Sequence, residues 1–117
     1  MYLIITKSFP PEKGGMQNLM GGLSETLSKY KMTKVITDYN ENGYNYDQQF
    51  SFTIERVKGI KLLRKYRKAL HANNFLKNNN NVSCVIADHW KSLELIKTDK
   101  KKVCLIHSKE INHDRGS

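Results

Sequence analysis

Short apolar runs that alternate with helix-like segments limit this chain to few folds. Five such runs are rich in β-branched residues, and four of them show little polar alternation. Strands of that kind are usually covered on both faces, as in a parallel sheet. We therefore expect strands over residues 2–6, 34–38, 50–57, 82–88 and 102–107.

Helical periodicity follows the first expected strand. One helix face is predicted to carry the apolar residues Met16, Leu19, Met20, Leu23, Leu27 and Tyr30. Gly21 and Gly22 interrupt this helix, where each costs about 1 kcal/mol relative to alanine. Two interpretations remain open: close packing of the helix against the sheet, or a helix that is locally weak.

A second helix is predicted over residues 60–77, with Leu63, Tyr66 and Leu70 on its inner face, and a short third helix over residues 89–96. The polar segments 39–49 and 78–81 are expected to be loops. This order predicts a single α/β domain over residues 1–117. Its sheet should be Rossmann-like and mostly parallel, with helices on both faces.

The composition limits the classes of partner and of cellular environment that can be expected. The 117 residues suffice for one core, and twenty Lys and Arg against eleven Asp and Glu give a net charge of +9. Such a charge predicts an acidic partner: a membrane surface, a nucleic acid or a phosphorylated ligand.

Cys84 and Cys104 lie in apolar runs and are expected to be reduced, buried thiols, with a disulfide as the minor alternative. No run approaches the roughly 20 apolar residues of a membrane span, so we expect a cytoplasmic protein.

The loop after the first strand holds the clearest candidate site. Pro10 and Pro11 end the strand, and Gly14 and Gly15 stand beside the start of the first helix. In parallel sheets, ligands bind beyond the carboxyl ends of the strands. Glycine lets backbone N–H groups approach an anion at a helix start. The loop is therefore either a backbone cradle for an anion or a plain tight turn. It matches neither G-x-G-x-x-G nor a P-loop.

These segments resemble a known family. The stretch "FPPEKGGMQNLMGGLSETLSK", followed by "KVITD", "VIADHW" and "IHSKEIN", resembles the N-terminal domain of family-four retaining glycosyltransferases of the two-Rossmann (GT-B) kind. The resemblance spans nearly the whole chain. One departure is Ser108, where the family has glycine after the histidine.

The resemblance implies an enzyme that transfers a sugar from a nucleotide-sugar to a glycan or lipid-linked acceptor, with no cofactor besides that donor. In the family, a second domain binds most of the donor. This chain would then be the acceptor-side half, truncated or encoded apart from its partner domain, and inactive alone. The alternative is a non-catalytic basic α/β module that binds an anionic membrane surface or a partner protein.

The resemblance also implies roles for individual residues. His107 would be catalytic, over the donor sugar, and Gly14 and Gly15 would approach the donor phosphate and the acceptor. Glu110 could orient His107 or bind an acceptor hydroxyl, and Trp90 could stack on a sugar face. The alternatives are an exposed histidine at a strand end, a solvated glutamate in a loop and a tryptophan packed in the core.

A basic stripe marks the second predicted helix. Lys61, Lys65 and Lys68 recur at helical spacing, with Arg64 beside them. Such a stripe suits an anionic membrane, which would hold the chain at the inner face of that membrane. The alternative is a solvated helix face. Nucleic acid is disfavoured because no reader motif is present.

A metal site is not expected, because the residues that could form one lack a standard spacing. Asp88 and His89 are adjacent, and His107, His113 and Asp114 follow later. This arrangement matches no standard zinc pattern. We therefore assign no metal ligand.

Overall fold

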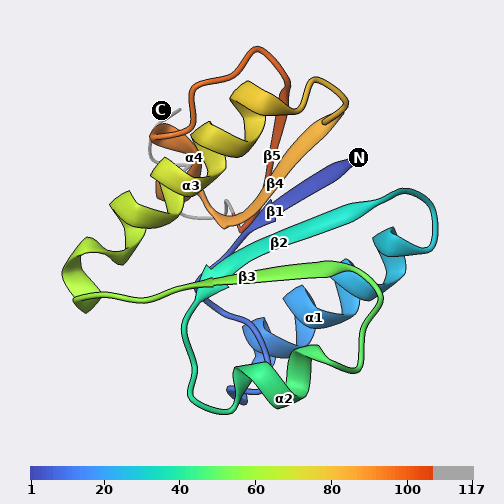
Figure 1. Ribbon diagram of the computed structural model, residues 1–117, viewed down its shortest axis with the longest axis vertical. Helices are drawn as coiled ribbons and strands as arrows, with labels where there is room; N and C mark the ends of the chain where they lie inside the picture. Colours follow the sequence, from blue (N-terminus) through green and yellow to red (C-terminus); the bar gives the residue numbers. More distant parts are fainter. Residues whose placement is uncertain (107–117) are drawn as a thin grey trace.

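The computed structural model describes residues 1–106 (Figure 1). In chain order the elements are β1 (Tyr2–Ile5), α1 (Gly15–Ser28), β2 (Thr33–Asp38), α2 (Gly43–Asp47), β3 (Thr53–Val57), the 3-10 helix η1 (Lys61–Leu63), α3 (Arg64–Asn78), β4 (Cys84–His89), α4 (Trp90–Glu94) and β5 (Lys101–Ile106). The predicted order of strands and helices is confirmed. The additional element is α2, a short helix within the segment expected to be a loop.

The sheet has five parallel strands in the order β3-β2-β1-β4-β5. This order confirms the predicted α/β, Rossmann-like class. The chain runs outward from β1 to β3 and then crosses back to place β4 on the other side of β1. The carboxyl ends of β1 and β4 therefore meet where the order reverses, which is where open α/β sheets bind ligands.

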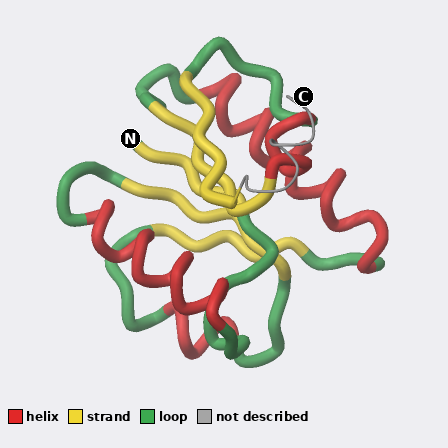
Figure 2. The backbone as a smooth tube through the Cα atoms, turned by 180° about the vertical axis from the view of Figure 1, so that it is seen from behind, coloured by secondary structure: helices red, strands yellow, loops and turns green. Residues whose placement is uncertain are grey.

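Helices cover both faces of the sheet, with α1 and α2 on one side and α3 and α4 on the other (Figures 1 and 2). Alternate residues of β1 point to opposite cores, as the strand period requires. Ile4 packs with Met20 of α1 in one cluster, whereas Leu3 and Ile5 pack with Ala72 of α3 in the other. The continuous apolar character of β1 follows from this double coverage.

The inner face of α3 differs from the one predicted. Leu63, Tyr66 and Leu70 were expected to face the sheet, but each is half exposed or more. The residues that α3 buries are Lys68, Ala69, Ala72 and Leu76. Small alanine side chains at i and i+3 let the helix lie close to the sheet, and the bulkier apolar residues are turned outward. The helical period was predicted correctly, but its phase was wrong.

Two glycines of α1 resolve the alternatives for that helix. A Cβ at Gly21 would lie 2.8 Å from Cγ of Pro10, so the helix and the loop after β1 pack closely there. A Cβ at Gly22 would meet nothing within 4 Å. Close packing therefore explains Gly21 but not Gly22, and the partner at Gly21 is the loop after β1 rather than the sheet that was expected. The predicted apolar face is wrong at its end, because Tyr30 lies beyond α1 and is exposed.

Cys84 and Cys104 lie on neighbouring strands and are half-buried rather than fully buried. Cys104 pairs in register with Ala87 rather than with Cys84, and no disulfide joins the two thiols. Burial raises the pKa of Cys84, with a smaller opposing effect from Lys101. Within residues 1–106, no helix is long and apolar enough to cross a membrane.

Candidate functional site

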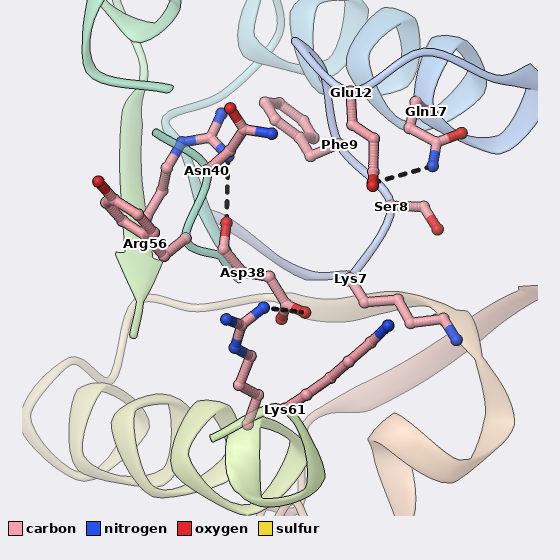
Figure 3. Close-up of a pocket in the computed structure, with 11 residues that line it drawn as sticks. Lys7, Ser8, Phe9, Glu12, Gln17, Asp38, Asn40, Arg56 and Lys61 are labelled. Atoms are coloured by element: carbon pink, nitrogen blue, oxygen red, sulfur yellow. Dashed lines mark hydrogen bonds and ion pairs between the residues drawn. The ribbon is translucent and has the colours of Figure 1, made fainter. Parts of the chain in front are cut away.

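A hollow in the described chain lies at the carboxyl edge of the sheet. A pocket of about 360 Å³ opens between the loop after β1, the ends of β2 and β3, and the start of η1 and α3 (Figure 3). A second pocket, of about 280 Å³, reaches the start of α4. The two pockets share Lys7, Asp38, Lys61 and Arg64. We call the pair the carboxyl-edge cleft.

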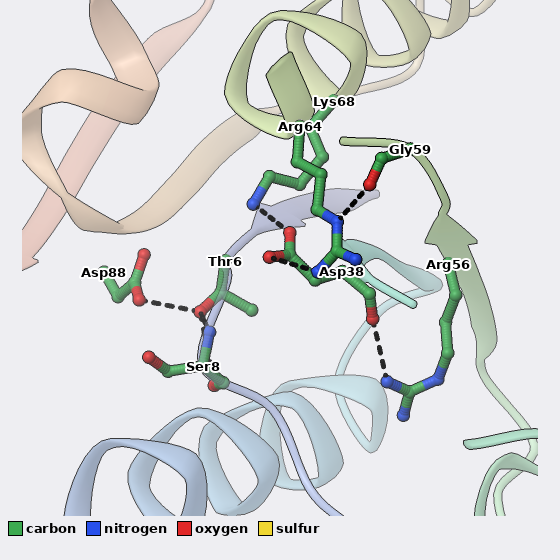
Figure 4. Close-up of polar contacts among 8 residues, drawn as sticks. All are labelled: Thr6, Ser8, Asp38, Arg56, Gly59, Arg64, Lys68 and Asp88. Atoms are coloured by element: carbon green, nitrogen blue, oxygen red, sulfur yellow. Dashed lines mark hydrogen bonds and ion pairs between the residues drawn. The ribbon is translucent and has the colours of Figure 1, made fainter. Parts of the chain in front are cut away.

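Asp38, the last residue of β2, stands at the junction of the two pockets. Lys68 Nζ makes a close ion pair with its Oδ1, and Nη1 of Arg64 lies 3.8 Å from its Oδ2 (Figure 4). Arg64 is also fixed by its Nε, which donates to the carbonyl oxygen of Gly59 at 2.9 Å. Asp38 thus draws the first turns of α3 toward the sheet edge.

Arg56, near the end of β3, ties together three segments around the first pocket. Its Nε and Nη2 donate to the two carboxylate oxygens of Asp47 at 2.8 and 2.9 Å. Nη2 also donates to the carbonyl oxygen of Pro10 at 2.7 Å, and Nη1 to that of Asp38 at 3.1 Å. This nearly buried guanidinium therefore holds α2, the loop after β1 and the end of β2 together. A Cβ at Gly43 would lie 2.3 Å from Arg56 Nε, so this approach requires glycine.

Thr6 and Asp88 join the ends of β1 and β4, where the strand order reverses. The Thr6 hydroxyl donates to Oδ2 of Asp88 at 2.8 Å and accepts from the backbone N–H of Ser8 at 2.9 Å (Figure 4). Asp88 is only 4% exposed, and its Oδ1 has no hydrogen-bond partner among residues 1–106. The contact fixes the start of the loop that forms one wall of the first pocket.

Positive charge dominates the cleft. Seven cations and two carboxylates line the two pockets together: Lys7, Arg56, Lys61, Arg64, Lys65, Lys68 and Lys91 against Glu12 and Asp38. Arg56, Arg64 and Lys68 are paired with carboxylates, whereas no acidic partner within residues 1–106 lies in ion-pair range of Lys7, Lys61, Lys65 or Lys91. The cleft therefore carries an excess of positive charge.

Gly14 and Gly15 lie at the start of α1, as predicted, but line neither pocket. Gly14 has φ +154°, and a Cβ there would lie 2.2 Å from Oε1 of Gln17. The Gln17 side chain thus lies beside Gly14, and its Nε2 donates to Glu12 at 3.2 Å. Gly15 is open, with nothing within 4 Å of an added Cβ. Both glycines are exposed, and Gly15 is the one at which an added side chain would meet no described atom.

Trp90 is the first residue of α4 and is 40% exposed, so it is not a core tryptophan. It lines neither pocket, although its neighbour His89 lines the second and accepts a hydrogen bond from the Lys91 N–H. His107 and Glu110, the predicted catalytic and acceptor-binding residues, lie outside the described residues.

The predicted basic stripe is divided by the structure. Lys61 and Lys65 are exposed and Arg64 is partly exposed, and all three line the cleft. Lys68 was expected on the same exposed face, but it is 5% exposed and paired with Asp38. The prediction is wrong for Lys68, because its ammonium group pairs with the carboxylate of Asp38 and the side chain is therefore turned toward the sheet.

Lys7, Asp38 and Arg56 are among the site residues that were not singled out from the sequence. Lys7 and Asp38 each follow or end a predicted strand, so their place at the carboxyl edge could have been inferred. Arg56 gave no such signal, because its partner Asp47 lies in a helix that the sequence did not indicate. Within the described chain, no three His, Cys, Asp or Glu side chains gather as metal ligands would.

Comparison with protein-family models, with curated proteins and with solved structures finds no match to this chain. The resemblance to glycosyltransferases therefore remains an expectation from the sequence. What the chain does has to be argued from the geometry and charge of the cleft.

Proposed function

We propose that this chain is the acceptor-side domain of a sugar-transferring enzyme whose donor is a nucleotide-sugar. The observation that carries the proposal is the cleft at the carboxyl edge of a Rossmann-like sheet, next to the point where the strand order reverses. Ligands of open α/β sheets bind there. The excess of cations suits a phosphate-bearing ligand, and the order of segments in the chain is that of the glycosyltransferase family it resembles.

Transfer would need groups from two domains. The bond between the anomeric carbon and the diphosphate oxygen of the donor breaks, and the acceptor hydroxyl oxygen forms the new bond. The proton of that hydroxyl leaves with the diphosphate. A second domain would bind most of the donor, and this chain would bind the acceptor in its cleft. His107 and Glu110 are proposed to approach the reacting sugar from the segment after β5.

Gly15 gives the proposal a sharp test. It begins α1, where unpaired backbone N–H groups favour an anion, and no side chain caps that end. The chain should be combined with a donor-binding domain encoded in the same or a neighbouring reading frame. Labelled nucleotide-sugars and a lipid or glycan extract then report transfer. Gly15→Val should abolish labelling without unfolding the domain.

Gly22→Val is the matched control, since Gly22 also lies in α1 with nothing within 4 Å of an added Cβ. It should retain transfer. A folded Gly15→Val enzyme with full activity would remove the backbone cradle from the proposal. No labelled product with any nucleotide-sugar, from a folded pair of domains, would contradict the proposed function itself.

A second candidate is a basic module that binds an anionic membrane surface. One observation favours it: the outward face of η1 and α3 is apolar as well as basic. Leu62 is 84% exposed, and Leu63, Tyr66 and Leu70 recur beside it at i, i+3, i+7 spacing. Exposed apolar side chains next to lysines suit an interface of acyl chains and anionic headgroups.

Vesicle sedimentation separates this candidate from a solvated helix face. The chain should sediment with vesicles that contain phosphatidylglycerol and not with phosphatidylcholine alone, and salt should weaken the binding. Leu62→Gln should reduce sedimentation, whereas Leu19→Gln, at an exposed leucine of α1, should not. Equal binding to both kinds of vesicle would exclude the electrostatic part of the candidate.

A further inference from the structure

We propose that the carboxyl-edge cleft contains a subsite for a phosphate group, formed by Lys7, Lys61 and Arg64. Lys7 comes from the loop after β1, Lys61 from the first residue of η1 and Arg64 from the first residue of α3. All three line both pockets, and Figure 3 shows Lys7 and Lys61 at the first of them. Three cations from three segments therefore converge on one hollow. The ligand they suit is a phosphomonoester or a diphosphate.

Asp38 does not neutralise this cluster. It is the one carboxylate that lines both pockets, and Lys68 already makes a close ion pair with it. Lys68 is buried and comes from the second turn of α3, so it stays with Asp38. Lys68 and Arg64 thus share Asp38, and among residues 1–106 no carboxylate lies in ion-pair range of Lys7 or Lys61, so positive charge remains in excess in the cleft.

Arg64 is oriented before any ligand arrives. Its Nε donates to the Gly59 carbonyl at 2.9 Å, while its Nη1 lies 3.8 Å from Asp38, beyond hydrogen-bond range. The guanidinium is held in place by one strong contact and keeps further N–H groups for an acceptor. A planar guanidinium with two N–H groups on one side matches two oxygens of a phosphate.

The placement of these cations is unfavourable without an anion. The start of a 15-residue helix carries about half a positive charge, and cations near it are destabilising. The first turn of α3 nevertheless holds Arg64 and Lys65, contains no acidic residue and has no side-chain cap. Lys61, at the start of η1, lies three residues before Arg64. An anion in the cleft would relieve this repulsion.

The remainder of the first pocket indicates what the phosphate is attached to. Beyond the cations, its walls carry hydroxyl, amide and carboxylate groups from Ser8, Gln17, Tyr39 and Asn40, and from Glu12. These groups suit a hydroxyl-rich moiety. The phosphate site stands on the cleft alone, but the ligand's role as a phosphorylated acceptor rests on the proposed function.

Calorimetric titration of the chain with inorganic pyrophosphate tests the site, at an ionic strength held constant with sodium chloride. Lys61→Gln and Lys7→Gln should each weaken binding by about tenfold, because each removes one charge-assisted contact. The control is Lys29→Gln, which removes an exposed lysine at the other end of α1 and should change the Kd less than twofold.

Two results would overturn the phosphate site: no binding of pyrophosphate to the unaltered chain, or an equal loss in Lys29→Gln and Lys61→Gln. Titration with glucose 1-phosphate and with a short-chain prenyl phosphate distinguishes the sources of the phosphate. Tighter binding of glucose 1-phosphate would indicate a sugar phosphate as the ligand, and tighter binding of the prenyl phosphate would indicate a lipid phosphate. In either case the binding should depend on Lys61, as that of pyrophosphate does.

Failure of the site and failure of the proposed function are separable. Pyrophosphate binding that depends on Lys61, without sugar transfer by the two-domain enzyme, would keep the site and reject the function. Sugar transfer by the two-domain enzyme, without binding of pyrophosphate that depends on Lys61, would keep the function and reject the site.

Discussion

Arg56 and Asp47 form a two-point ion pair in which Nε and Nη2 of the guanidinium donate to Oδ2 and Oδ1 of the carboxylate, at 2.8 and 2.9 Å. Both side chains are largely buried. The same guanidinium binds the backbone carbonyls of Pro10 and Asp38. Arg56 therefore holds the walls of the first pocket in place. Because its charge is paired with that of Asp47, it does not contribute to the excess of positive charge in the cleft.

Replacement of Arg56 should be costly for that reason. Arg56→Met leaves the Asp47 carboxylate buried without a partner and two carbonyls without their donor. A loss of about 3 kcal/mol in the free energy of unfolding is expected. Urea unfolding followed by circular dichroism measures it. Arg67→Met removes an exposed arginine of α3 and should stay within about 0.5 kcal/mol; equal losses in the two variants would contradict the role of the guanidinium.

The two glycines inside α1 should respond in opposite directions. Gly22→Ala adds a methyl group in open space and should stabilise the chain by up to about 1 kcal/mol through helix propensity. Gly21→Ala brings the same group to 2.8 Å from Pro10, so the loop after β1 must move. We expect a lower melting temperature for Gly21→Ala. If both variants were stabilised alike, the helix and the loop would not be in close contact.

The sheet could be predicted from the sequence because two signals mark most of its strands: the apolar character of the run and the kind of segment that follows it. Four of the five runs show little polar alternation and end at a polar or proline-containing segment, so β1, β2, β4 and β5 were found within two residues of their bounds. The run at 50–57 alternates partly, and β3 begins three residues later than predicted, at Thr53. Helix α2 was missed. Its five residues show no apolar period, and it depends on the contact between Asp47 and Arg56, which lies nine residues away.

The phase of α3 could not be predicted from hydrophobicity alone. Leu63, Tyr66 and Leu70 form the more apolar stripe, yet α3 buries the stripe with Lys68, Ala69 and Ala72. Two long-range factors decide this: small side chains permit close contact with the sheet, and Asp38 attracts Lys68. Both factors involve the sheet, which lies outside the helix, so the local pattern predicted the wrong face and an exposed Lys68.

Lys68 and Lys65 should therefore differ, although both lie on the predicted stripe. Lys68→Glu places a buried negative charge against Asp38 and should cost at least about 3 kcal/mol or prevent folding. Lys65→Glu, at an exposed position, should change the free energy of unfolding by about 0.5 kcal/mol. Chemical denaturation of the two variants makes the comparison, and a stable Lys68→Glu chain would show that Asp38 does not hold α3.

The last prediction concerns pH and Glu55, which links β3 to its neighbours. Its Oε1 lies 3.0 Å from Nζ of Lys34 on β2, and its Oε2 contacts Nδ1 of His71 on α3. Burial alone would raise the pKa of Glu55. Hydrogen bonds and charge interactions with Lys34 and His71 outweigh burial and hold the pKa below its ordinary value of 4.5.

A lowered pKa in the folded chain means that the unfolded chain binds the proton more tightly. The stabilisation by Glu55 is then fully present above about pH 5 and is lost as the pH falls through the folded-state pKa. Glu55→Gln should destabilise the chain at about pH 6, and its difference from the unaltered chain should shrink toward about pH 3. Glu94→Gln, at an exposed glutamate of α4, should show no such convergence. A difference for Glu55→Gln that stays constant across this range would mean that Glu55 acts through packing rather than through its charge.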